Sequence, residues 1–356
     1  MTGSKTMRAR GKIKRDYGRE LAVIRTRTHW FILAGFLILL GILPGILTWT
    51  DNNSWLTWLN FTFITIIAVL GLNITTGMAG QVSLGHAAFI MVGGYTLGIL
   101  TTKMDWPFWL ALPAGGIITA AIGLVVGAPS VRLRGFYLAI ATLAFLFFAQ
   151  FLIKHLDITN GIHGLIGIPA PSIGDFRIDT DLKWYYLILL LTIGGVISSV
   201  NLTRSRLGRA FSAVRDNDIT APSMGINVYL TKVTAFFIGS LYAGVAGGLG
   251  ASYLSVIRVD QFTVFESIWY LGMVIIGGAG STAGTVMGVL FLRLISQFLH
   301  VVSMGSWVPS LGASFWSSIT YAIYGAAIIA FVSFQPYGLI AIWRKWQAQY
   351  KRWPFG

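Results

Sequence analysis

The chain contains no cysteine among its 356 residues, which excludes disulfide bonds and thiolate metal sites. Charged residues are also scarce: they make up 11% of the sequence, against about 25% in an average soluble domain. Histidine occurs at five scattered positions, and no two of them have the spacing of a zinc site with an acidic partner. We therefore predict no metal site and no ordinary soluble fold.

Long apolar segments account for much of the sequence. Hydrophobic residues make up 55% of the chain and the mean hydropathy is +0.72. Apolar runs recur at about 20 residues each, the length that crosses a bilayer. We predict an all-α polytopic membrane protein with about ten transmembrane helices. The predicted segments are 30–49, 56–74, 83–102, 107–128, 135–153, 184–200, 231–253, 267–279, 284–300 and 316–333.

The eighth segment, 267–279, is shorter than a normal span and is glycine-rich at its end. We expect this segment, or the junction at 75–82, to be re-entrant or broken. The predicted number of spans is therefore eight to ten.

Basic residues are distributed unevenly. Nine of the 26 lysines and arginines lie in the first 29 positions. This distribution of the net charge of +14 favours a cytoplasmic N-terminus that contacts anionic lipid, and it argues against nucleic-acid binding. Ten spans then place the basic loop 201–230 inside and the acid-rich loop 154–183 outside. We expect an inner (plasma) membrane protein with a cytoplasmic tail at 1–29, a transmembrane domain at 30–333 and a basic cytoplasmic tail at 334–356.

Two glycine-rich stretches break the apolar pattern. The first is TTGMAGQVSLGHAAFIMVGGY (75–95) and the second is GGAGSTAGTVMGVLF (277–291). Transporters carry paired broken segments at corresponding places in two halves, although glycine-rich helix packing alone also produces such a likeness. Backbone polarity is tolerable there if it faces protein or water, so we interpret the pair as a gate. The candidate gate glycines are Gly277, Gly278, Gly280 and Gly284.

Polar side chains in or beside the apolar segments are candidates for a translocation pathway, because such groups are expensive in lipid and face the bundle interior. Each can equally form a helix–helix hydrogen bond. The candidates are Asn73, Gly77, Gly80, Gln81, Ser83, His86, Thr142, Glu266 and Ser267. Arg293 lies within the ninth segment, and the topology places Glu266 near the outer surface, so we do not expect these two to pair.

The longest predicted inner loop contains SRLGRAFSAVRDNDITAPSMGINV (205–228). Leu207, Phe211 and Val214 fall on one apolar face of a helix at i, i+4 and i+7. We expect Thr220 to cap a second short helix that Gly225 ends, so the loop forms a helix–turn–helix that docks on a cytoplasmic partner. The apolar face can pack on that partner or back on the membrane domain.

The same loop closely resembles the cytoplasmic loop of permease subunits of branched-chain (hydrophobic) amino-acid ABC importers, the LivM type. The resemblance continues in order along the chain and covers most of 71–293. It is specific to the family and much less specific to the solute. The further blocks that carry it are 71–95, 132–145, 159–169, 235–251 and 276–289.

The resemblance implies a set of partners. Such a subunit works with a second, LivH-type permease, two ABC ATPase subunits and an extracytoplasmic solute-binding protein. It is not an enzyme and binds no cofactor, since ATP and Mg belong to the ATPases; accordingly, no G-x-x-x-x-G-K-[ST] motif occurs in the chain. The residues implied to couple to the ATPase are Arg206, Leu207, Gly208, Arg209, Phe211, Val214, Arg215, Asp216, Met224 and Gly225.

Three other functions compete with this interpretation. A related permease for urea or short amides has the same motifs. An ion-coupled secondary transporter requires acidic residues in mid-span, and no acid lies securely there. An enzyme acting on lipids requires a convergent catalytic set, and the sequence contains none.

Overall fold

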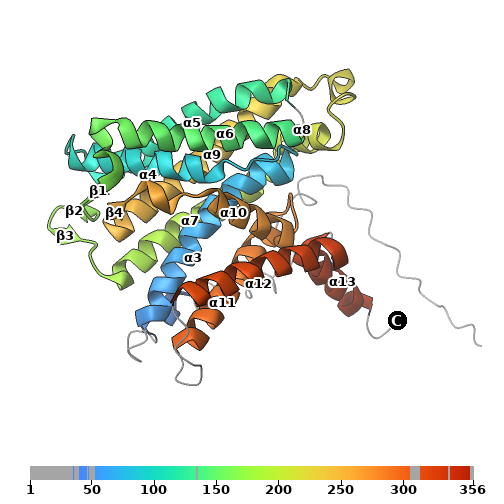
Figure 1. Cartoon of the computed structure of the whole chain (residues 1–356). Helices are drawn as coiled ribbons and strands as arrows, with labels where there is room; N and C mark the ends of the chain where they lie inside the picture. The colour runs from blue at the N-terminus through green and yellow to red at the C-terminus, as the bar shows by residue number, and fades with distance from the viewer. Residues whose placement is uncertain are drawn as a thin grey trace, which may run out of the picture.

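The computed structural model describes residues 35, 40–45, 47, 53–133, 135–304, 313–335 and 337–352. These residues form a helical membrane protein (Figure 1), which confirms the predicted fold class. The first half of the described chain contains α3 (Asn53–Leu72), α4 (His86–Thr102), α5 (Phe108–Gly127), α6 (Phe136–His155) and α7 (Asp181–Arg204). The second half contains α8 (Arg206–Asp216), α9 (Val228–Leu254), α10 (Val264–Gly277), α11 (Thr282–Met304), α12 (Ala313–Phe334) and α13 (Gly338–Arg352).

Seven of the described helices are long and apolar enough to cross a membrane, and α4 and α12 contain shorter apolar stretches. The nine predicted segments from 56–74 onward each correspond to one helix. The first predicted segment, 30–49, lies largely outside the described residues. Part of the predicted C-terminal tail forms the helix α13, which packs against α10 and α11.

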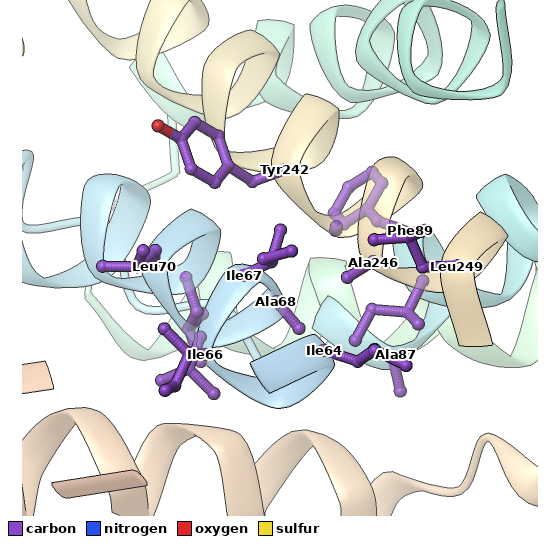
Figure 2. Close-up of a cluster of buried hydrophobic side chains, with 14 of the residues drawn as sticks. Ile64, Ile66, Ile67, Ala68, Leu70, Ala87, Phe89, Tyr242, Ala246 and Leu249 are labelled. Atoms are coloured by element: carbon purple, nitrogen blue, oxygen red, sulfur yellow. The ribbon is translucent and has the colours of Figure 1, made fainter. Parts of the chain in front are cut away.

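Helix α9 lies at the centre of the bundle and packs along α3, α4 and α5. Figure 2 shows aliphatic and aromatic side chains of α3, α4 and α9 filling the space between these helices. The backbones approach closely at glycines: a Cβ added at Gly93 of α4 would overlap the backbone of Gly244, and one at Gly71 of α3 would overlap Gly239. Small residues allow such contact between lipid-embedded helices.

Short connections gather at two opposite ends of the bundle. At one end, β1 (Leu165–Ile166) pairs antiparallel with β4 (Val256–Ile257), and β2 (Ser172–Ile173) pairs with β3 (Phe176–Arg177). The strands lie at the left of Figure 1 and α8 lies at the right. The loops predicted to face outside and the loops predicted to face inside thus separate spatially, and we name these the strand end and the α8 end.

We predict that alanine substitution destabilises the subunit at one glycine of α9 and leaves its stability unchanged at another. A Cβ at Gly247 would overlap the carbonyl oxygen of Ile90, whereas a Cβ at Gly250 meets nothing within 4 Å. Gly247→Ala should therefore destabilise the subunit by about 1–3 kcal/mol through overpacking. The measurement is the melting temperature of the purified subunit in detergent. Gly250→Ala is the matched control and should melt like the wild type; equal melting of both variants would contradict the packing argument.

Candidate functional site

The two glycine-rich breaks meet at the α8 end. Helix α3 continues into a π-helix, Asn73–Met78, and α10 ends at Gly277, which is followed by Gly278 with a φ of 110°. The side-chain Oδ1 of Asn73 accepts a hydrogen bond from the backbone N–H of Gly280 at 2.8 Å. A Cβ at Gly77 would overlap that same nitrogen. Two segments more than 200 positions apart are therefore in direct backbone contact.

Helix α8 lies on this junction through Arg215. Its Nη1 donates to the carbonyl oxygen of Gly77 at 3.1 Å, and its Nη2 donates to Asp216 Oδ1 at 3.0 Å. A Cβ at Gly80 would lie 2.8 Å from Arg215 Cγ, and one at Gly280 would lie 2.7 Å from Arg215 Nη1. The arginine side chain thus fills the space beside glycines of both breaks.

The structure decides which way the apolar face of α8 points. Phe211 and Val214 are buried, at 0% and 3% exposure, whereas Leu207 is 44% exposed. Phe211 belongs to the same buried hydrophobic cluster as the transmembrane helices. Most of this face therefore packs back on the membrane domain. Leu207 is left on the surface with Arg206 and Arg209.

The second part of the loop forms a short 3₁₀ helix, Ala221–Met224. Thr220 makes no capping hydrogen bond at its start, so that part of the prediction is wrong. Asn217 instead stabilises the turn before this helix, because its Oδ1 accepts the N–H groups of Ile219 and Thr220 at 3.0 and 3.2 Å. Gly225 follows with a φ of 76°, and Met224 before it is 78% exposed.

A buried ion pair fixes this loop to α9. Lys232 Nζ lies 3.1 Å from Asp218 Oδ2, and the side chains are 8% and 21% exposed. Gln81 joins the first break to the same point, since its Nε2 donates to the carbonyl oxygen of Lys232 at 3.1 Å. Gln81, Lys232 and Asp218 line a cavity of about 320 Å³ together with Gly80 and Arg215.

Several predicted pathway residues surround the start of α4. Ser267 Oγ accepts the N–H of Ala87 at 3.0 Å, and Thr142 Oγ1 accepts the N–H of Leu84 at 3.0 Å. His86 is 2% exposed, and its Nε2 lies 2.8 Å from the carbonyl oxygen of Ala68. The Ser267 contact satisfies a backbone N–H in the first turn of α4, which a helix start leaves without an intrahelical partner. Ser83 is also buried, and its hydroxyl has no hydrogen-bond partner within the described residues.

Glu266 and Arg293 line one cavity of about 290 Å³ between α3, α9, α10 and α11. The sequence did not favour pairing of these two side chains; α11 runs back beside α10 and brings both of them to the same cavity. Arg293 Nη2 donates to Thr65 Oγ1 and to the carbonyl oxygen of Phe61. The hydroxyl-bearing ring of Tyr270 lines the same cavity.

The candidate gate glycines form the contact between α10, α11 and α13. A Cβ at Gly277 would overlap the carbonyl of Gly284, and one at Gly338 would lie 2.5 Å from the nitrogen of Gly278. Sequence reasoning did not select Lys232, Arg293 or Gly338 as site residues. A lysine and an arginine within apolar segments were the available signals for the first two. Over the described ranges, no group of three or more His, Asp or Glu side chains is placed to hold a metal ion.

We predict that Asn73 stabilises the junction of the breaks. Asn73→Leu removes the acceptor and leaves the Gly280 N–H without its partner, which costs about 1–3 kcal/mol. The thermal unfolding midpoint of the purified subunit should fall. Ser83→Ala is the matched control at the same break, because its hydroxyl lacks a partner among the residues described. A midpoint unchanged in Asn73→Leu would show that this hydrogen bond contributes nothing.

Comparisons with known proteins agree with this architecture. The high-affinity branched-chain amino acid transport system permease protein LivM of Escherichia coli strain K12 is 33% identical over 263 residues, which cover 67% of this chain and 62% of that protein. The probable LivM of Methanocaldococcus jannaschii is 26% identical over 77% of this chain and 89% of its own length. The xylose transport system permease protein XylH of Escherichia coli K12 is 28% identical over 46% of this chain and 36% of that protein.

No solved structure matches the chain. The family model described as "Branched-chain amino acid transport system / permease component" matches residues 54–332, which include both breaks, α8 and the two cavities. The chain therefore belongs to the family of branched-chain amino acid transport system permease components.

Proposed function

We propose that this chain is the membrane-spanning subunit of an ATP-driven importer of branched-chain or similar hydrophobic amino acids. A solute-binding protein delivers the solute outside, and two ABC ATPase subunits dock on the α8 end and drive transport. A second, LivH-type permease completes the membrane domain. The subunit itself binds no ATP or Mg. Both of its termini are cytoplasmic.

The contact of Arg215 with both glycine-rich breaks carries this proposal. An ATPase that moved α8 would move Arg215, and with it the backbone of Gly77 and the side of Gly280. The buried residues Phe211 and Val214 hold α8 on the membrane domain, so its displacement is transmitted to the transmembrane helices. Helix α8 thus has the geometry of a lever between a cytoplasmic motor and a transmembrane gate.

The exposed residues of the loop 205–228 suit a contact with a protein partner. Leu207, Ile219 and Met224 are 44%, 73% and 78% exposed, so the loop offers large apolar side chains that a protein partner can cover. Arg206 and Arg209 are also exposed. A partner groove with an apolar floor and acidic edges suits this combination.

We predict that the outward residues of α8 hold the ATPase. Leu207→Asp combined with Arg209→Glu should abolish co-purification with the ATPase subunits and leucine uptake, because it reverses charge and removes apolar area at the contact. Since both side chains are exposed, the amount of subunit in the membrane should not change. Ile166→Asp is a control of equal chemistry, as Ile166 is 73% exposed at the strand end. Normal ATPase binding by the double variant would sink the docking assignment.

We predict a different defect for Arg215. Arg215→Ala should retain the ATPase subunits, because the apolar contact residue Leu207 and the exposed Arg206 and Arg209 remain in place. It should uncouple ATP hydrolysis from uptake, because the contact with the Gly77 carbonyl is lost. The charge-assisted hydrogen bond to Gly77 contributes about 1.5–3 kcal/mol. Its loss should change the equilibrium between the open and closed states of the gate about ten- to hundredfold. Uptake and ATPase activity measured together in proteoliposomes decide the matter. If both activities stay at wild-type levels, α8 acts by another route.

A further inference from the structure

A second feature of the molecule is the cavity between α3, α9, α10 and α11, which combines opposite charges with an aliphatic wall. Its volume is about 290 Å³, at the lower end of the about 300–1,000 Å³ typical of small-molecule sites. It has room for one small solute. Its polar lining includes Glu266, Tyr270 and Arg293.

Hydrogen bonds fix the position of Arg293, but they do not use all of its donor groups. Nη2 donates to Thr65 and to Phe61 of α3, whereas Nε is buried and has no hydrogen-bond partner within the described residues. A guanidinium in the middle of a transmembrane helix is expensive and marks function by default. Its planar donor arrangement matches a carboxylate better than any other small anion of metabolism except phosphate.

Glu266 supplies the opposite charge. It lies in the first turn of α10, lines the same cavity and is within electrostatic range of Arg293. One anion and one cation in a single cavity leave it electrically neutral. A solute that carries both charges on neighbouring atoms can pair with each of them without leaving either side chain buried and unpaired.

The remaining wall is aliphatic. Ile64 of α3, Ile90 of α4 and Leu254 of α9 line it, and Ile257 of β4 closes it toward the strand end. Gly250 leaves open space, since a Cβ there would meet nothing within 4 Å. β4 pairs with β1 of the loop predicted to face outside, so the cavity lies on the side from which an imported solute arrives.

We propose that this cavity binds the imported amino acid as a zwitterion: Arg293 pairs with its carboxylate, Glu266 with its ammonium group, and the aliphatic wall contacts its side chain. The inference rests on the proposed function, because it names the place where that function handles its solute. Neutral sugars, urea and amides lack both charges and would leave Glu266 and Arg293 unpaired.

The test uses the purified full chain in lipid nanodiscs and measures its thermal stabilisation by L-leucine, titrated to the solubility limit. L-leucine should raise the melting temperature. 4-Methylpentanoate, which lacks the ammonium group, and xylose should not. Glu266→Gln and Arg293→Gln should each weaken leucine binding at least about tenfold. Arg258→Gln and Asp260→Asn are charge-matched controls, since both side chains are more than half exposed outside the cavity.

Two further variants guard against misfolding. The double variant Glu266→Gln/Arg293→Gln leaves no unpaired charge and should fold, yet should not bind leucine. Gly250→Leu adds an aliphatic side chain at a position where a Cβ meets nothing within 4 Å, and it should block binding while preserving the melting temperature without solute. Leucine stabilisation that persists in the double variant, or that is absent from the wild type, overturns the proposed site.

The test of this binding site can fail independently of the test of the proposed function. Leucine uptake by the complete transporter in proteoliposomes, with its binding protein and ATPases, tests the function alone. If the wild-type transporter imports leucine but the isolated subunit shows no leucine stabilisation, the site is wrong and the function stands. If the complete transporter imports xylose or urea and not leucine, the proposed function is wrong.

Discussion

The hydrogen bond from the Gly280 N–H to Asn73 Oδ1 is the contact on which the α8 end depends. It joins two interrupted helices exactly where each has left regular α-helical geometry, so that a backbone group freed by one break is satisfied by a side chain of the other. In lipid an unsatisfied N–H costs several kcal/mol. The breaks are therefore tolerable only as a pair, and Arg215 can reach both because they are already together.

The presence and order of the helices were predictable because the length of an apolar segment is a strong signal of a membrane-spanning helix. The nine predicted segments from 56–74 onward each match a helix, and the amphipathic pattern at 205–228 correctly indicated α8. The likeness of the stretches 75–95 and 277–291 suggested a paired gate, and the structure brings the two stretches into contact. These features follow from local composition and periodicity, which the sequence displays directly.

Three-dimensional partners were not predictable in the same way. Arg215 was expected to couple to the ATPase, but its contact with Gly77 could not be predicted, because periodicity separates apolar from polar residues and does not reveal a glycine backbone that an arginine can reach. The sequence did not show that Glu266 and Arg293 line one cavity, because loop charges position helix ends without giving depth, and α10 is only 14 residues long. Ser267 and Thr142 were read as pathway candidates, yet they accept N–H groups at the start of α4.

The start of α4 has a mechanical consequence. Its Ala87 N–H is bound by a side chain of α10, and its first histidine contacts the backbone of α3. If one of these three helices slid past the others, a buried hydrogen bond would break. We therefore expect α3, α4 and α10 to move as one unit during transport.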